Sequence, residues 1–261
     1  MPIDWGSLIN ERHFFDHDGL RLSYLDSGGT GPVLLALHGH LNEARFIDEG
    51  AVPRAVPYRV VALDQRGHGE SDHALTYEID DYVGDAVALL EQLGIENVTV
   101  LGHSLGGVIA YSLAARIPAR VDKLVVVDIG AVVEDDLGIV LTWPRRASTR
   151  SGLVAAFGFM GPKQEYLMRE YADGWGVPWA AADMVASQGS LNGAHWHSWL
   201  ATTMPALLVH GSESRTLSRE QADDMARRRP ATTLIHLPGG HAVYVDAPDD
   251  YSKAVTSFLR Q

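Results

Sequence analysis

A serine at position 104 stands between a run of β-branched residues and a small, apolar segment, with glycine two residues before it and two after. The pattern Gly102-His-Ser104-Leu-Gly106 predicts a sharp turn from a strand into a helix, where only glycine fits at the flanking positions. Such a turn lifts the hydroxyl above the sheet, and the helix N-terminus directs the Leu105 amide at developing negative charge. Ser104 is therefore the candidate nucleophile; the alternative is a tight connection without chemistry.

A serine hydroxyl is a poor nucleophile near neutral pH and needs a base that is held in turn by an acid. Of the 12 histidines, His241 is the best placed. It follows the last predicted strand and precedes the last predicted helix, on a loop at the carboxyl edge of the expected sheet. We expect His241 to be the base; an exposed loop histidine is the alternative.

Five short segments of the chain, taken together and in their order, are more specific than any one of them alone. They are residues 37–39 (LHG), 63–71 (LDQRGHGES), 102–106 (GHSLG), 127–130 (VDIG) and 240–241 (GH). With them the sequence resembles the α/β-hydrolase superfamily over nearly its whole length. The resemblance implies acyl transfer through a Ser104 ester, hydrolysis by a water that His241 activates, and no cofactor. It also implies that His40, directly after His-Gly, supplies a second oxyanion amide beside that of Leu105.

The acid departs from the family's usual pattern. It usually lies in the loop after the seventh strand, where this chain has Ser214 at the expected aspartate position. Some members, including lipases and haloalkane dehalogenases, carry the carboxylate after the sixth strand, and Asp128 stands at that point. We expect Asp128 to be the acid. Glu213, one position from the usual site and with a longer side chain, is the alternative, and Asp128 could otherwise cap the segment that follows it.

Short, nearly continuous apolar runs predict strands that are covered on both faces, and helix-like segments lie between several of them. Six such runs are residues 33–37, 59–63, 98–101, 123–127, 206–209 and 233–237. Residues 20–26 instead alternate apolar and polar residues, as a half-buried strand does, and residues 12–17 before them are expected as a further strand. The expected helices are 79–93, 105–116, 218–228 and 249–259. The alternation predicts an α/β fold with a mostly parallel, eight-stranded sheet and helices on both faces. The first two strands are expected to form a hairpin.

Residues 131–200 interrupt this alternation, because they contain no convincing buried strand and hold five of the six tryptophans. We interpret them as a helical lid inserted after the sixth strand, with residues 1–130 and 201–261 as the core. Packing helices without contact to any site are the alternative. The candidate substrate-binding residues are Trp143, Trp175, Trp179, His195 and Trp196.

The composition limits the partners. With 33 acidic and 21 basic residues, the formal net charge is −12, so nucleic acids and anionic membranes would be repelled. The chain has no cysteine, and the pairs His38/His40 and His195/His197 lack further ligands nearby, so no metal site is expected. The first residues do not read as a secretory signal and no apolar run is long enough to span a membrane, so we expect a cytoplasmic protein.

The expected function is hydrolysis of carboxylic esters or lactones of small, largely apolar substrates that enter under the tryptophan-rich lid. Amides, thioesters or carbon–carbon bonds are alternative targets of the same apparatus. A ligand-binding or signalling protein that turns over slowly or not at all is the alternative from another class, because a fold does not fix a function. The expected partner is a small-molecule substrate, and the oligomeric state is left open.

Overall fold

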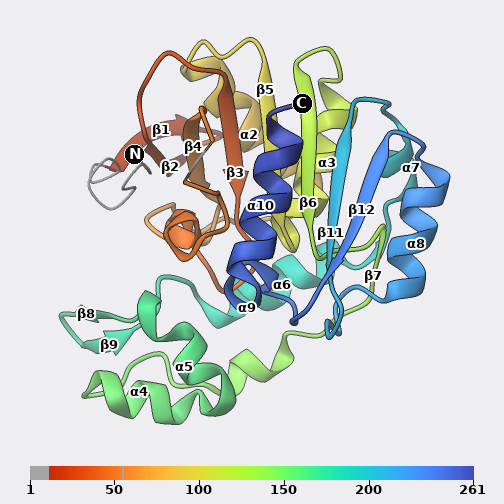
Figure 1. The fold of residues 1–261 in the computed structure, drawn as a ribbon. Helices are drawn as coiled ribbons and strands as arrows, with labels where there is room; N and C mark the ends of the chain where they lie inside the picture. Colours follow the sequence, from red (N-terminus) through yellow and green to blue (C-terminus); the bar gives the residue numbers. More distant parts are fainter. Residues whose placement is uncertain (1–11, 55) are drawn as a thin grey trace.

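A single eight-stranded sheet forms the centre of the computed structural model, which describes residues 12–54 and 56–261 (Figure 1). The strand order is β1-β2-β4-β3-β5-β6-β11-β12. The strands are β1 (Arg12–His17), β2 (Leu20–Asp26), β3 (Val33–Leu37), β4 (Arg59–Asp64), β5 (Val98–His103), β6 (Val121–Val127), β11 (Ala206–Gly211) and β12 (Thr232–Leu237). β2 is antiparallel to both β1 and β4, and the other neighbours are parallel. The expected sheet and its hairpin are confirmed.

Helices cover both faces of the sheet, as predicted. The long helices are α2 (Ile79–Gln92), α3 (Leu105–Arg116), α8 (Arg219–Arg228) and α10 (Pro248–Leu259). Three shorter helices also pack against the sheet: η1 (Ala44–Glu49), α7 (Trp196–Leu200) and α9 (Val243–Asp246). Residues of α2, α3, α7 and α8 share one buried apolar cluster, whereas those of η1, α9 and α10 share another. Figure 1 shows α10 in front of the sheet and α2 and α3 behind it.

The two clusters explain why the strand sequences look continuously apolar. In β3, Leu35 and Leu37 belong to the cluster with α2 and α3, while Leu34 and Ala36 belong to the cluster with α10. Successive side chains of a strand point to opposite faces, so a strand with helices on both sides must be apolar at every position. Burial on both faces fixes the register, and with it the height at which each strand ends.

Residues 131–200, here called the cap segment, lie mostly beyond the carboxyl ends of the parallel strands, at the bottom of Figure 1. The segment contains α4 (Arg150–Ala156), α5 (Gly161–Gln164), α6 (Ala181–Leu191), and the short 3₁₀ helices η2 (Gly138–Thr142), η3 (Gly158–Met160) and η4 (Glu165–Leu167). It also contains two small antiparallel pairs, β7 (Val132–Val133) with β10 (Gly193–Ala194) and β8 (Arg169–Tyr171) with β9 (Gly174–Gly176). A purely helical segment was expected; strands of two or three residues are too short to give a pattern in the sequence.

The end of the cap segment packs into the core. Trp199 of α7 is fully buried, its indole N–H donates to the Met225 carbonyl of α8 at 3.0 Å, and its ring lies 5.9 Å from that of Tyr111. α7 therefore supports the sheet rather than covering the strand ends.

An ionic network with two buried carboxylates joins the cap segment to the core. Arg169 of β8 pairs with Glu43 and Glu70, and Glu43 also pairs with Arg12, which in turn contacts Asp64. The side chains of Glu43 and Asp64 are 4% and 0% exposed. Burial, with the nearby Asp64 charge, raises the pKa of Glu43. The two arginines are therefore needed to balance carboxylates that water barely reaches.

No helix among the described residues combines the length and the apolar character needed to cross a bilayer. The expectation about a secretory signal concerns residues 1–7, which lie outside the described part of the chain.

Replacing Arg169 by Met should lower the free energy of unfolding by about 2–3 kcal/mol, because a buried carboxylate loses one of its two cations. Urea unfolding measures this change. The matched control is Arg116→Met, which breaks an exposed pair with Asp80 and should cost less than about 1 kcal/mol. Equal losses in the two variants would contradict a structural role for the network.

Candidate active site

Ser104 occupies a strained turn between β5 and α3. Its backbone has φ 53° and ψ −123°, a conformation that a non-glycine residue adopts only where the surroundings enforce it. The Ser104 N–H donates to the Val127 carbonyl of β6 at 3.0 Å, and the Gly106 N–H donates to the His38 carbonyl at 3.1 Å. The turn is thus fixed from both neighbouring strands.

Close backbone contacts explain the glycines around the serine. A Cβ at Gly102 would lie 2.0 Å from the Gly106 carbonyl oxygen, and one at Gly106 would lie 2.1 Å from the Leu37 carbonyl oxygen. The prediction that only glycine fits at both positions is therefore confirmed. Gly39 has a related role: a Cβ there would lie 2.9 Å from the Ser104 Cβ, so glycine lets the loop with His40 approach the serine.

Asp128 and His241 are hydrogen-bonded across the ends of β6 and β12. The His241 Nδ1–H donates to Asp128 Oδ2 at 2.8 Å, and the Gly211 N–H donates to Asp128 Oδ1 at 2.9 Å. Asp128 has no solvent exposure and a left-handed backbone, with φ 51°. Because Nδ1 donates its proton to the carboxylate, the neutral imidazole keeps its free electron pair on Nε2, as a base requires.

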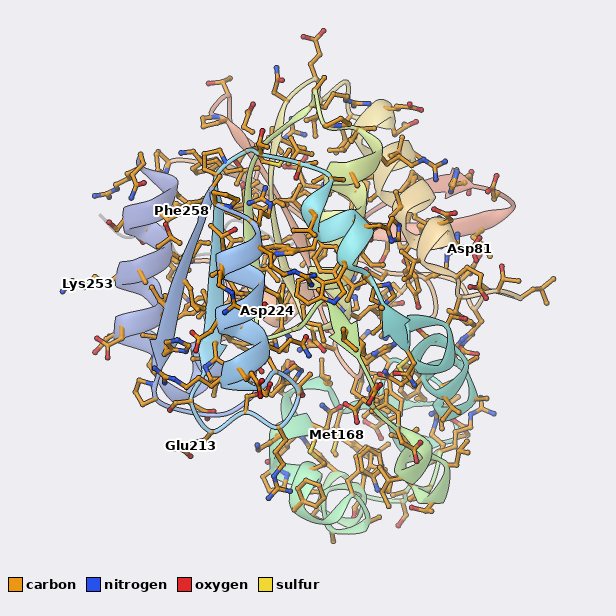
Figure 2. The ribbon with its side chains drawn as sticks, turned by 90° about the vertical axis from the view of Figure 1, so that its right-hand side faces the viewer. Asp81, Met168, Glu213, Asp224, Lys253 and Phe258 are labelled. Atoms are coloured by element: carbon orange, nitrogen blue, oxygen red, sulfur yellow. The ribbon has the colours of Figure 1, made fainter. Side chains whose placement is uncertain are left out.

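Ser214 is a partner of this carboxylate that the sequence reasoning did not identify. Its hydroxyl donates to Asp128 Oδ2 at 2.5 Å. The signal was present, because Ser214 stands where the family usually has its acid. Glu213, next to it, is exposed and its amide donates to the Gly239 carbonyl at 2.9 Å; Figure 2 shows its side chain at the outer tip of the loop, directed away from the molecule. The carboxylate beside His241 is that of Asp128.

His103, the residue before the serine, supports the loop of His241. The two imidazole rings lie 4.5 Å apart, and the His103 Nε2–H donates to the His241 carbonyl at 3.0 Å. Burial, with the neighbouring imidazole of His241, lowers the pKa of His103 well below its usual value, so the His103 ring stays neutral. No local pattern predicts this contact, because His103 and His241 are 138 residues apart in the chain.

The side chain of His40 contacts the cap segment at the hydroxyl of Ser187, which also contacts Tyr82 of the core. The His40 Nε2 and the Tyr82 hydroxyl each lie 2.7 Å from the Oγ of Ser187, which belongs to α6. Burial and the neighbouring imidazoles of His68 and His241 lower the pKa of His40, so its ring is neutral. This contact fixes the loop whose backbone amide is the expected oxyanion donor.

Two further buried histidines shape the loops beneath the site. The His38 Nδ1–H donates to the Gly39 carbonyl at 2.7 Å while its Nε2 accepts from the Gln65 N–H at 3.1 Å. The ring of His68 lies 4.9 Å from that of His38. Burial lowers the pKa of both to about 3. These imidazoles serve as neutral hydrogen-bonding groups, and the described residues contain no cluster of three or more potential metal ligands.

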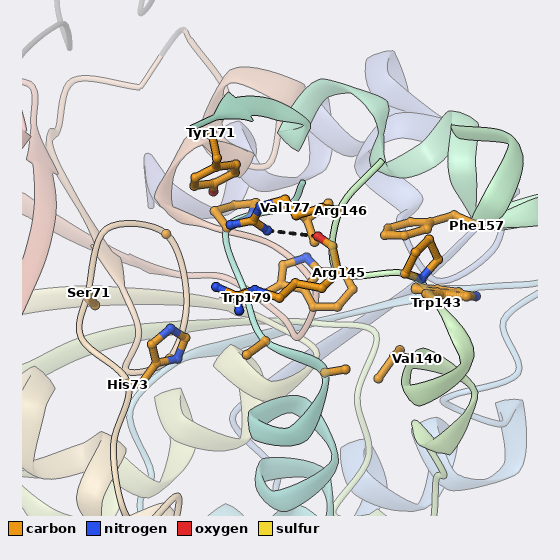
Figure 3. Close-up of a pocket in the computed structure, with 16 residues that line it drawn as sticks. Ser71, His73, Val140, Trp143, Arg145, Arg146, Phe157, Tyr171, Val177 and Trp179 are labelled. Carbon is orange, nitrogen blue, oxygen red and sulfur yellow. Dashed lines mark hydrogen bonds between the residues drawn. The ribbon is translucent and has the colours of Figure 1, made fainter. Parts of the chain in front are cut away.

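The candidate substrate-binding residues separate into two groups. Trp143 and Trp179 line a cavity of about 460 Å³ between the cap segment and the loop after β4 (Figure 3). The other three do not line it. Trp175 pairs through its backbone with Ala147, the His195 Nε2–H donates to the Leu191 carbonyl at 2.7 Å, and Trp196 lies under Arg228 at 4.1 Å.

Comparison with known proteins gives a consistent picture. A family model described as "Alpha/beta hydrolase family" matches residues 33–254. The chain is 27% identical over 252 residues to a 2-(acetamidomethylene)succinate hydrolase of Mesorhizobium japonicum, covering 88% of this chain and 89% of that protein. It is 30% identical over 260 residues to a 3-hydroxybutyrate-oligomer hydrolase of Cupriavidus necator, covering 87% and 89%. The crystal structure of an E-2-(acetamidomethylene)succinate hydrolase superimposes with a TM-score of 0.83 at 24% identity, covering 95% of this chain and 100% of the other.

The buried histidines predict a loss of stability in mild acid. In the unfolded chain a histidine takes up a proton near pH 6.5, whereas His38 and His68 in the fold stay neutral down to about pH 3. The unfolded state therefore binds more protons as the pH falls below about 6.5, and each such histidine removes about 1.4 kcal/mol of stability per pH unit.

His68→Gln should make the free energy of unfolding less dependent on pH between about 6 and 4, by about 1.4 kcal/mol per unit. Urea unfolding across that range gives the slope. Ser212→Ala, at an exposed position without a titrating side chain, is the control and should leave the slope unchanged. A wild-type slope in His68→Gln would show that His68 is protonated in the fold.

Proposed function

The chain is a hydrolase of the alpha/beta hydrolase family, and from that premise we propose that it cleaves carboxylic esters or lactones through an acyl-enzyme on Ser104. The observation that carries this proposal is the 2.8 Å hydrogen bond between the His241 Nδ1–H and the buried Asp128 carboxylate, at the sheet edge where Ser104 has its strained backbone. A nucleophile, a base and an orienting acid on three separate loops are the parts that acyl transfer requires.

In the proposed first half-reaction, the Ser104 Oγ attacks the carbonyl carbon and its proton passes to the Nε2 of His241. The Asp128 carboxylate stabilises the imidazolium that forms, and the negative charge on the carbonyl oxygen is stabilised by the amides of His40 and Leu105. His241 then returns the proton to the leaving alkoxide. In the second half-reaction His241 takes a proton from water, and the resulting hydroxide attacks the carbonyl carbon of the Ser104 ester. The bond between that carbon and Oγ then breaks, His241 returns the proton to the Ser104 Oγ, and the acid is released.

The first turn of α3 supports the placement of one oxyanion donor. Leu105 is the first residue of this 12-residue helix, so its N–H has no partner within the helix and the helix dipole favours negative charge there. His40 would supply the second donor from the loop that Ser187 and Gly39 hold against the nucleophile turn.

We also propose that the cap segment acts as a lid for small, largely apolar substrates. The cavity of about 460 Å³ beside it has the size of a typical small-molecule site, and aromatic rings form much of its wall. An amide substrate is the second candidate, because one relative is named for hydrolysing a 2-(acetamidomethylene)succinate.

Asp128→Asn should lower kcat on 4-nitrophenyl esters by about four orders of magnitude, because the imidazole loses the partner that fixes its tautomer. Glu213→Gln is the matched control and should change kcat little. A kcat that is unchanged in Asp128→Asn and strongly lowered in Glu213→Gln would assign the role of the acid to Glu213. A wild-type protein without turnover on esters of increasing chain length, or on the corresponding anilides, would instead favour the ligand-binding alternative.

Ser214→Ala should lower kcat by about 10-fold with little change in KM, because a charge-assisted hydrogen bond to the Asp128 carboxylate is lost. Steady-state kinetics on one ester measures the effect. Ser212→Ala, at an exposed position of the same loop, serves as the control. If both variants behave like the wild type, Ser214 does not help to hold the acid.

A further inference from the structure

The wall of the cavity between the cap segment and the loop after β4 combines aromatic and aliphatic side chains with polar ones. Its apolar side chains include Val140, Trp143, Phe157, Val177 and Trp179. Trp143 and Phe157 are stacked, with ring centroids 4.5 Å apart and planes inclined by 20°. Figure 3 shows these rings on one side of the cavity and the loop with Ser71 and His73 on the other. Such walls suit a flat, apolar ligand.

The same cavity has an unusual charge for this protein. Arg145, Arg146 and His73 line it, and none of the described residues that line it is acidic. The whole chain carries a formal net charge of −12. A cavity with only basic charged groups in an acidic protein favours an anion, because an anion would be repelled from most other surfaces.

Arg146 is held in place before any ligand arrives. Its Nε donates to Asp173 at 2.7 Å, its Nη1 donates to the Arg145 carbonyl at 2.9 Å, and its guanidinium lies 4.0 Å from the centre of the Tyr171 ring. A Cβ at Gly176 would lie 2.3 Å from Nη1, so glycine makes room for the guanidinium. Figure 3 shows the bond between the two arginines as a dashed line. These contacts reduce the freedom that Arg146 would lose on binding.

Arg145 provides the donors that are free to bind. The backbone near it is anchored because Ala147, two residues further along, exchanges two hydrogen bonds with Trp175 of β9, at 2.9 and 2.8 Å. No described residue makes a hydrogen bond or a close ion pair with the Arg145 guanidinium, whereas Arg146 pairs directly with Asp173. The charge of Arg145 acts on Asp173 only from a longer distance, where it adds to the effect of Arg146 in lowering the pKa of that carboxyl group. The planar guanidinium fork matches a carboxylate in geometry.

We propose that this cavity binds an organic carboxylate with a flat apolar body, and that in the working enzyme the carboxylate belongs to the substrate. The carboxylate would pair with Arg145, and the apolar body would lie against Trp143 and Trp179. Inorganic phosphate matches the charge but leaves the apolar wall unused. The assignment of the carboxylate to the substrate rests on the proposed hydrolase function, whereas the binding of a carboxylate does not.

The cavity lies close to the expected oxyanion loop without including the reacting groups. Trp179 forms a backbone bridge with His68, whose ring is 6.0 Å from that of His40, and Leu41 shares an apolar cluster with Trp179. Neither Ser104 nor His241 lines the cavity. It would therefore hold a part of the substrate that is remote from the bond being cleaved, where binding energy can position the reacting group.

Isothermal titration of the full chain with benzoate and with benzamide tests the binding, because the two share a shape and differ in charge. We expect benzoate to bind more tightly, and Arg145→Gln to weaken its binding by roughly 10- to 100-fold. Arg150→Gln, at an exposed arginine that pairs with Glu165, is the control. Equal binding of the two compounds, no effect of Arg145→Gln, or phosphate binding as tight as that of benzoate would overturn the proposal.

Kinetics with an anionic ester and a neutral one tests the assignment to the substrate. For 4-nitrophenyl hydrogen glutarate against 4-nitrophenyl butyrate, Arg145→Gln should lower the ratio of the two kcat/KM values by about 10-fold or more. Arg150→Gln should leave the ratio unchanged. An unchanged ratio in Arg145→Gln would overturn the substrate assignment. Failure of the wild type to cleave either ester would contradict the proposed ester hydrolysis and the substrate assignment together, and benzoate binding would still stand.

Discussion

The arrangement of the loops at the candidate active site depends on one buried carboxylate and the hydrogen-bond donors around it. Asp128 has no exposure to water and accepts hydrogen bonds from the Gly211 N–H, the Ser214 hydroxyl and the His241 imidazole. A buried carboxylate is costly unless donors surround it, so these contacts tie together the loops after β6, β11 and β12. The same requirement orients the imidazole, because Nδ1 must donate and Nε2 is left free to accept. Stability and chemistry thus impose the same geometry.

The sheet makes this convergence possible. Parallel strands end at one edge, and burial on both faces fixes the height at which each of them ends. Ser104 and Asp128, which end adjacent strands, both have positive φ values of 53° and 51°. Such backbones are unfavourable in isolation and persist because the packed core on either side over-determines them. The strain is concentrated where side chains leave the sheet to meet one another.

The strands of the sheet and the turn at Ser104 could be predicted from the sequence, because few residue types are tolerated at these positions. Alternate burial into two cores makes β3 apolar throughout, and the contacts of Gly102 and Gly106 exclude every side chain. The position of Asp128 at a strand end could also be predicted, because Asp128 directly follows the apolar run of residues 124–127. The rest depends on contacts between distant segments. Ser187 and His40 are 147 residues apart, so no local pattern shows that they touch. The tryptophan-rich composition did not reveal that Trp199 faces the core, nor could strands as short as β8 and β9 set a period.

We propose that the hydroxyl of Ser104 is the activated nucleophile. Treatment of the folded protein with a fluorophosphonate, followed by intact mass measurement and peptide mapping, tests this proposal. We expect one covalent adduct per chain, on Ser104, and no adduct once His241 is replaced by Ala, since the base would then be missing. An adduct on another residue, or full labelling of Ser104 in the absence of His241, would contradict it.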